Sequence, residues 1–153
     1  MDGFHLPRLA SRLLFVGLGL TAPALAAVPI SIQVDPVVQL QATGQCRGCD
    51  LRGADLRGAH LIGVDLREAD LRGARLEDAN LEGADLSGAR LGGAILQRAM
   101  LSNAELVNTD LRQADLRDAV VINAYAPGVR TQGMHYAGAD LTGSHLIYGG
   151  GPD

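Results

Sequence analysis

The chain lacks tryptophan and lysine, and its 153 residues include only five aromatic side chains, three Tyr and two Phe. Because nucleic-acid bases are commonly bound by stacking on aromatic rings, this scarcity argues against a stacking platform. The two cysteines, Cys46 and Cys49, are too few for a four-ligand structural zinc site, and no cluster of histidines accompanies them. We therefore predict no metal and no cofactor.

An excess of charge of one sign is also lacking. Seventeen acids oppose 13 bases, every base is arginine, and the formal net charge is −4. The two signs are interleaved along the chain rather than gathered in blocks, which excludes a charged tail. Nucleic acid is accordingly a disfavoured partner.

No apolar run is long enough to be a clear membrane span, which needs about 20 residues. Arg8 and Arg12 precede a short apolar stretch over residues 13–20, and Ala24-Leu25-Ala26 supplies a small-x-small cleavage pattern. We predict a signal peptide over residues 1–26, with cleavage after Ala26 and a periplasmic or secreted mature chain. A thylakoid lumen is also compatible.

The alternative interpretation of residues 1–26 is an uncleaved membrane anchor, which the short apolar run and the prolines Pro23 and Pro29 disfavour. Cleavage would remove Asp2, Arg8 and Arg12, leaving 16 acids and 11 bases, a net charge of −5. After cleavage we expect no stable insertion into a membrane.

What the sequence does contain is a repeat of five residues. Leucine recurs at every fifth position from Leu51 to Leu116, 14 times without a gap. In the 20 units centred on residues 51–146, leucine holds the central position 16 times and alanine stands two residues earlier 14 times. A period of five fits neither an α-helix nor a plain strand, so it indicates a repeat architecture.

The chemistry of each position predicts the shape of one unit. Alanine, a polar residue (often Asp) and leucine alternate in, out and in, as in a short strand. Glycine or asparagine, for example Gly53, Gly58 and Asn103, stands two residues after most central positions, where tight turns and positive φ are tolerated. Each pentad is therefore predicted to form one short side and one corner, with the Asp side chains in solvent.

Units such as Ala54-Asp55-Leu56-Arg57-Gly58 and Ala84-Asp85-Leu86-Ser87-Gly88 resemble the pentapeptide-repeat proteins. The resemblance covers residues 46–148 and implies an all-β fold: a right-handed parallel β-helix of square cross-section with four pentads per coil, hence about five coils. It implies a narrow interior filled by Leu and Ala. We expect this architecture to offer no pocket and no enzymatic activity.

Three further segments complete the predicted organisation. Residues 27–45 form a lead-in, in which Asp35-Pro36 starts a short helix over residues 36–42 that caps the first coil. Residues 120–137 are degenerate, but glycines such as Gly128 and Gly133 keep the register, so we expect a continuous coil with Val121, Ala126, Thr131 and Tyr136 facing inward. Residues 149–153 form a C-terminal tail.

The Cys46-Arg47-Gly48-Cys49 segment places both sulfurs on inward positions of the first coil. Two buried free thiols and a disulfide are both compatible with this placement, and an oxidising compartment favours the disulfide. The resemblance supports a structural role, because many pentapeptide-repeat proteins share a similar Cys-x-x-Cys entry into the first repeat. A thioredoxin-like redox motif would need a βαβ context that is absent.

The candidates for catalysis do not converge. At 20 residues per coil, His60, His135 and His145 fall on three different faces, and no serine has a histidine and an aspartate in register. The same bookkeeping gathers apolar side chains on neighbouring faces of the C-terminal coils, a pattern typical of interaction surfaces. We predict an interaction patch that comprises Met100, Val107, Val120, Ile122, Tyr125 and Ile147.

Two functions fit these features. The first is an extracytoplasmic, non-catalytic structural or protein-interaction module, binding an unknown partner or itself through the C-terminal coils. The second, implied by resemblance to family members that mimic DNA and inhibit topoisomerases, would use an acidic ladder such as Asp65, Asp85 and Glu105. The many arginines dilute that ladder, and a secreted chain would not meet a topoisomerase, so we favour the first function.

Overall fold

The computed structural model describes residues 34–146. The predicted signal peptide (residues 1–26), the first part of the lead-in (residues 27–33), Ile147 of the predicted patch and the tail (residues 149–153) lie outside the described residues. The cleavage prediction therefore stays a prediction.

One α-helix, α1, spans Pro36–Thr43 at one end of the described chain. Its N-cap Asp35 accepts a hydrogen bond of 2.8 Å from the backbone N–H of Val37, and proline occupies the first turn, where its missing N–H costs nothing. Gly44 ends the helix with φ 67° and donates its N–H to the Leu40 carbonyl. The predicted helix is confirmed, one residue longer than expected.

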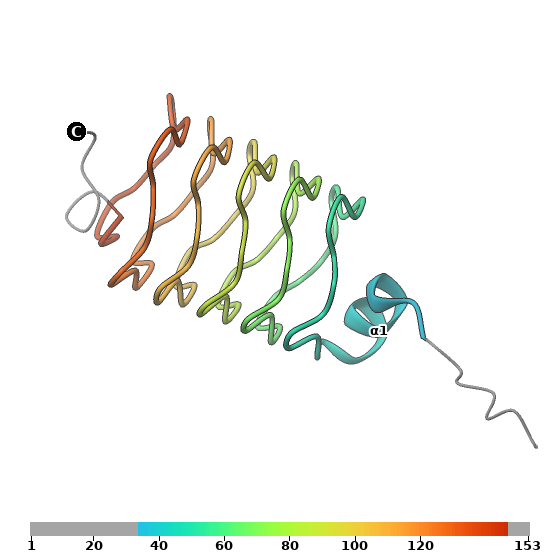
Figure 1. The fold of residues 1–153 in the computed structure, drawn as a ribbon. Helices are drawn as coiled ribbons and strands as arrows, with labels where there is room; N and C mark the ends of the chain where they lie inside the picture. The colour runs from blue at the N-terminus through green and yellow to red at the C-terminus, as the bar shows by residue number, and fades with distance from the viewer. Residues whose placement is uncertain (1–33, 147–153) are drawn as a thin grey trace, which may run out of the picture. The chain divides into compact units, whose positions relative to one another are not determined.

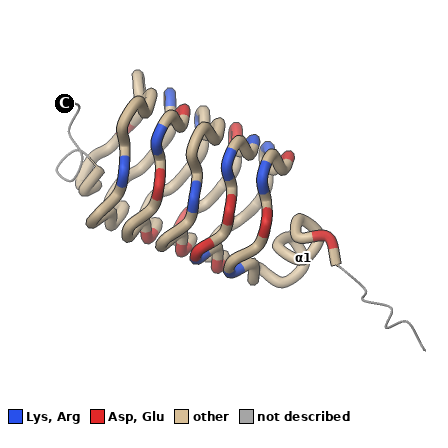
Figure 2. The backbone as a smooth tube through the Cα atoms, viewed as in Figure 1, with Lys and Arg blue, Asp and Glu red and all other residues tan. Residues whose placement is uncertain are grey.

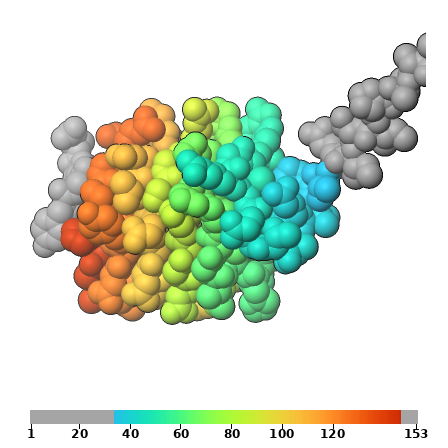
Figure 3. Space-filling model, turned by 90° about the horizontal axis from the view of Figure 1, so that it is seen from below, coloured from blue at the N-terminus to red at the C-terminus, as the bar shows by residue number. Residues whose placement is uncertain are grey.

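The rest of the described chain coils around one axis with a period of 20 residues (Figure 1). Sixteen parallel bridges run from Gln45↔Asp65 to Val120↔Asp140, and every one joins a residue to the residue 20 positions further on. Four pentads therefore make one turn of a parallel β-helix. The bridges involve single residues because each side holds only a few extended residues before the chain turns a corner. Successive coils lie directly against one another in the space-filling view (Figure 3).

The corners follow the predicted register without interruption. Every fifth residue from Gly48 to Gly143 has positive φ, including Gly128, Gly133 and Gly138 in the degenerate stretch. The expectation of a continuous coil through residues 120–137 is confirmed.

Several corners are occupied by residues that the sequence did not mark as turn formers. Glu68, Asp78, Arg98, Gln113 and Asp118 all have φ between 57° and 60°. A left-handed conformation costs an ordinary residue about 1–2 kcal/mol. It is stabilised here because the corner N–H donates to the next coil, as from Glu68 to the Ser87 carbonyl at 2.9 Å.

The core is a column of leucine and alanine. All 14 leucines from Leu51 to Leu116 are buried, and most alanines two residues before them are buried as well, which confirms the predicted alternation. Thr109 replaces one of these alanines and donates its hydroxyl to the Leu86 carbonyl at 2.9 Å, so its polar group is satisfied.

One inward assignment is wrong. Tyr136 occupies a central position but is 42% exposed, whereas Val121 and Ala126 are buried as expected. A tyrosine ring is larger than the leucine that the interior accommodates, and Tyr136 lies in the last described coil. One outward assignment also fails, because Asp110 is 8% exposed beneath Arg112 and Arg130.

Corner glycines of the last described coil are expected to be less tolerant of substitution than those of the first. A Cβ at Gly138 would lie 2.1 Å from the Asp118 Oδ1 atom, whereas a Cβ at Gly53 would meet nothing within 4 Å. Both glycines have positive φ, so Gly53→Ala should cost about 1–2 kcal/mol from backbone strain alone. Gly138→Ala should cost more in urea unfolding.

The double variant Asp118→Gly/Gly138→Ala separates the two terms. Removing the Asp118 side chain should bring the cost of Gly138→Ala down to that of Gly53→Ala, after correction for Asp118→Gly alone. Equal costs for the two single alanine variants would contradict the steric explanation.

Candidate functional site

The outer surface is dominated by pairs of aspartate and arginine within one pentad. In six units an Asp-Leu-Arg triplet places a carboxylate and a guanidinium on the same side of the chain, because residues two apart on a strand share a face. The six pairs are Asp50–Arg52, Asp55–Arg57, Asp65–Arg67, Asp70–Arg72, Asp110–Arg112 and Asp115–Arg117. Red and blue segments accordingly lie next to each other along the coils in Figure 2.

Each pair has the same two-pronged geometry. In Asp50–Arg52 the guanidinium Nε donates to Oδ1 at 2.7 Å and Nη2 donates to Oδ2 at 2.6 Å. The backbone N–H of Arg52 also donates to Oδ1, at 3.3 Å. Two parallel charge-assisted bonds are stronger and more directional than one. The sequence analysis missed these pairs, although the Asp-Leu-Arg spacing could have revealed them.

The pairing lowers the pKa of the carboxylates. Hydrogen bonds from the arginine side chains hold the pKa values of Asp50, Asp55 and Asp65 at about 2. The pKa of Asp115 lies further below its usual range, because Arg117 and then Gln97 both donate to its carboxylate. These aspartates are therefore charged and engaged, which makes them unsuited to act as general acids near neutral pH.

The pairs predict how stability depends on pH. Because the folded pKa values lie below the unfolded value of about 3.9, the stabilisation is fully present above about pH 4 and is lost as the pH falls toward 2. The melting temperature should be level from neutral pH to about pH 5 and should fall between about pH 4 and pH 2. Thermal melts followed by circular dichroism across this range would measure it.

The quadruple variant Arg52→Gln/Arg57→Gln/Arg112→Gln/Arg117→Gln is the control for this prediction. It removes four of the guanidinium partners but keeps every carboxylate, so its melting temperature should depend less on pH in the acid range. The same acid slope in the variant and the wild type would show that other groups cause the loss.

The acidic ladder predicted on one face is present as a stack but is not a continuous negative surface. Bridges join Asp65 to Asp85 and Asp85 to Glu105, so the three residues do lie in register. Arg67 pairs with Asp65 and also lies 3.6 Å from Asp85, which neutralises the N-terminal part of the ladder.

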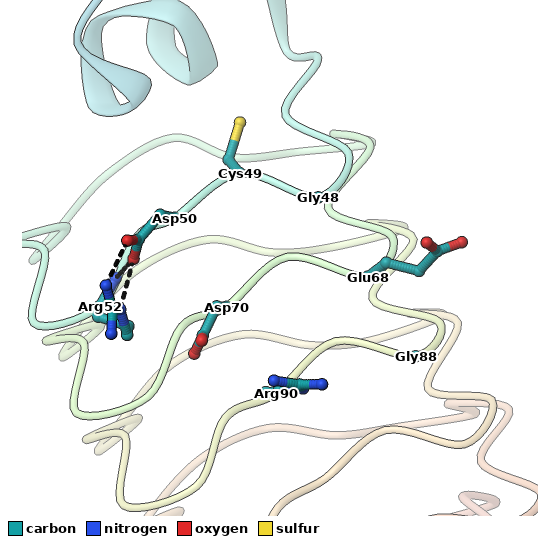
Figure 4. A pocket seen from close by; sticks show the side chains of 8 residues that line it. All are labelled: Gly48, Cys49, Asp50, Arg52, Glu68, Asp70, Gly88 and Arg90. Carbon is teal, nitrogen blue, oxygen red and sulfur yellow. Dashed lines mark hydrogen bonds and ion pairs between the residues drawn. The ribbon is translucent and has the colours of Figure 1, made fainter.

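The expectation that the architecture offers no pocket is wrong for the outer surface. A shallow hollow of about 500 Å³ lies across three coils at one corner and the adjoining face (Figure 4). It forms there because the corner positions Gly48 and Gly88 carry no side chains. Its lining residues are Gly48, Cys49, Asp50, Arg52, Glu68, Asp70, Gly88 and Arg90.

The charged groups of the hollow are mostly committed to one another. Asp50 is paired with Arg52 (dashed lines in Figure 4), Asp70 with Arg72, and Glu68 with Arg47. Among the described arginines, only Arg90 makes no ion pair. The lining therefore holds neither an available base nor a nucleophile beside one, and it supports no acid–base chemistry.

The histidines do not form a site. His60, His135 and His145 are exposed on three different faces, as predicted, and His145 contacts the Tyr125 ring, edge to face at 5.6 Å. Within residues 34–146, no three His, Cys, Asp or Glu side chains are grouped so that they could hold a metal ion. The same part of the chain contains no helix with the length and apolarity to cross a membrane.

Cys46 and Cys49 are joined by a disulfide in the structure, with their Cα atoms 5.2 Å apart. Cys46 is buried in the first coil together with Leu40 of α1, and Cys49 is half-buried at the edge of the hollow. The bond closes the first corner of the β-helix.

The predicted apolar patch lies across the edge between two neighbouring faces. Met100 and Tyr125 are exposed, by 41% and 51%, whereas Val107, Val120 and Ile122 are half-buried. A bridge stacks Met100 beneath Val120, and Asn123 forms the corner between Ile122 and Tyr125. The described members of the patch are therefore contiguous.

Comparison with known proteins agrees with this geometry. The family model for pentapeptide repeats matches residues 45–83 and 79–118. No curated protein matches the sequence.

Solved structures do match. The pentapeptide repeat protein alr5209 from Nostoc Pcc 7120 is 32% identical over 68% of this chain and 91% of its own, with a TM-score of 0.56. The pentapeptide repeat protein Rfr23 from the cyanobacterium Cyanothece 51142 is 26% identical over 77% of this chain and 97% of its own, with a TM-score of 0.55.

A third similar structure is QnrB1, a plasmid-mediated fluoroquinolone resistance protein, in a trypsin-treated form. It is 21% identical over 65% of this chain and 63% of its own, with a TM-score of 0.53, and this likeness concerns the fold alone. The similar structures imply that the coil is right-handed.

Proposed function

Because the chain belongs to the pentapeptide-repeat family, we propose that it is a non-catalytic protein-interaction module of the extracytoplasmic space. The β-helix would act as a rigid rod of about five coils, with α1 capping its first coil. The single observation that carries the proposal is the contiguous patch of Met100, Val107, Val120, Ile122 and Tyr125 on an otherwise charged surface.

The patch suits a binding role better than a structural one. Isolated exposed apolar residues are common, but contiguous ones on a rigid surface mark interaction sites more often. The interior below the patch is already filled by buried residues such as Leu101, Leu106 and Val121. The exposed parts of Met100 and Tyr125 therefore contribute nothing to the core and remain available to a partner.

The extracytoplasmic location rests on the signal-peptide pattern of residues 1–26 and is consistent with the Cys46–Cys49 disulfide, since disulfides persist in oxidising compartments. The intact mass of the native protein from separated cell fractions tests it. A chain beginning at Ala27 outside the cytoplasm is expected. Full-length protein in the cytosol would overturn the location and reopen the topoisomerase-binding alternative.

Binding through the patch is tested by the double variant Ile122→Asp/Tyr125→Asp. Two buried charges would disfavour any apolar contact, so we expect the wild type's oligomer or complex in size-exclusion chromatography to be lost. The β-sheet signal in circular dichroism should stay intact, because both side chains point out of the core.

The matched control is His135→Asp/Arg117→Asp, which adds two carboxylates on a different face. It should leave the assembly unchanged. An assembly that survives Ile122→Asp/Tyr125→Asp would exclude the patch as the binding surface.

A further inference from the structure

One of the four faces of the β-helix differs from the others in its charge. We call it the His60 face, and it consists of ten outward positions: His60, Ile62, Asn80, Glu82, Met100, Ser102, Val120, Ile122, Asp140 and Thr142. Bridges stack its first column from His60 through Asn80, Met100 and Val120 to Asp140. None of the ten positions holds an arginine, although residues 34–146 contain 11 of them.

The His60 face carries exposed apolar side chains along its length. Ile62 is 61% exposed and Met100 is 41% exposed, and Val120 and Ile122 are half-buried beside them. It includes three residues of the interaction patch and extends that patch toward the N-terminal coils. The apolar surface therefore runs along the axis of the rod.

The carboxylates without an ion pair gather on this face and at its edges. Most acids of the described β-helix are held by arginine, but Glu82, Glu105, Asp118 and Asp140 make no ion pair, and all four are exposed. Glu82 and Asp140 belong to the face itself. Asp118 lies at the corner that leads into the face, and Glu105 follows the corner that leaves it.

Arginine does not compensate these four charges. Arg98, at the same edge as Asp118, is bound to both carboxylate oxygens of Asp78 at 2.7 Å. Arg90, the one described arginine without an ion pair, stacks with Asp70 and Asp110 on the opposite face, ten residues away along the coil. Unpaired negative charge and unpaired positive charge thus lie on opposite sides of the β-helix.

We infer that the His60 face, with Glu105 and Asp118 at its edges, is a docking surface for a basic, apolar polypeptide segment. This inference rests on the proposed function and specifies the chemistry of the partner. Apolar side chains of the segment would cover Ile62, Met100 and Ile122, and its Lys or Arg residues would reach the four free carboxylates. Complementary charge at the rim of an interface mainly sets selectivity and the rate of association.

The size of the face favours a segment over a second rigid rod. Five coils spaced by about 4.8 Å and sides of five residues at about 3.4 Å each give at most about 400 Å². A stable interface buries about 800 Å² on each partner. A flexible segment can extend over both edges of the face and reach Glu105 and Asp118, whereas a flat face of a second rod cannot.

A short peptide of alternating lysine and leucine is a suitable probe. It would be titrated into the ¹⁵N-labelled full chain in roughly 0.1 M salt, at which charges more than about 10 Å apart are largely screened. Chemical shift changes should be concentrated at residues 60–62, 80–82, 100–102, 120–122 and 140–142. A matched peptide of alternating glutamate and leucine should produce none.

The variant Glu82→Gln/Glu105→Gln/Asp118→Asn/Asp140→Asn should weaken binding of the lysine–leucine peptide by about tenfold or more, since four exposed pairs are lost. The control Asp50→Asn/Asp55→Asn/Asp70→Asn/Asp110→Asn changes the net charge equally on other faces. It should alter the affinity by less than about threefold, because those carboxylates are already paired.

Three results would overturn the inference: no binding at millimolar peptide, shift changes centred on another face, or equal weakening in the two variants. If any of these occurs while Ile122→Asp/Tyr125→Asp still abolishes the native assembly, the interaction module stands and the basic segment is excluded as its partner.

Discussion

Replacing Leu86 with aspartate is expected to remove most of the folding stability of the β-helix. Leu86 is fully buried near the middle of the leucine column, and its carbonyl accepts the Thr109 hydroxyl from the next coil. Truncating a buried leucine to alanine costs about 2–5 kcal/mol. Leu86→Asp adds an unpaired buried charge, and the whole domain is worth only about 5–15 kcal/mol.

The loss should extend beyond the substituted coil. In a repeat architecture each coil is stabilised mainly by its two neighbours, so a coil that cannot close leaves both without a partner. Urea unfolding followed by circular dichroism should show a large fall in the midpoint for Leu86→Asp and an intermediate fall for Leu86→Ala.

The matched control for Leu86→Asp is Arg90→Gln, which changes an exposed residue of the same coil that makes no ion pair. It should shift the free energy of unfolding by no more than about 0.5 kcal/mol. A wild-type midpoint for Leu86→Asp would mean that the interior is not packed as described.

Substitution of Leu40 in α1 is expected to have the second largest effect. Leu40 is 1% exposed and belongs to the same buried cluster as Cys46 and Leu51 of the first coil. Leu40→Asp should therefore detach α1, at a cost of roughly 2–5 kcal/mol, and leave the first coil uncovered.

An uncovered coil presents unpaired backbone groups and apolar side chains, which invite association with other chains. Hydrogen exchange should become faster over residues 46–63 in Leu40→Asp, and sedimentation should show larger species.

Val38→Asp is the matched control within the same helix, because Val38 is 56% exposed. It should behave as wild type in both measurements. If Leu40→Asp and Val38→Asp behave alike, α1 does not act as a cap.

Most of the fold could be predicted from the sequence because the interior is uniform. A column of leucine and alanine accepts little else, so the five-residue period of Leu51 to Leu116 already contains the coil, its inward side and its corners. The start of α1 could be predicted for a local reason as well, since Asp35 and Pro36 satisfy the first turn without help from the rest of the chain.

The candidate site was harder to predict because it depends on neighbours 20 residues apart and on the orientation of long side chains. The patch of Met100 and Tyr125 followed from the 20-residue register alone. The hollow beside Cys49 did not, because it arises where corner residues without side chains lie next to charged residues of three coils.

The sequence by itself determined the repeat, its register and the identity of the buried residues, because five-residue spacing and side-chain size act locally. Only the tertiary structure decided which charges are free. Carboxylates such as those of Asp65 and Glu105 occupy the same position of the repeat, yet Arg67 engages the first and no ion pair engages the second. That difference depends on which side chains the stacked coils bring within hydrogen-bonding distance, and a single pentad cannot specify it.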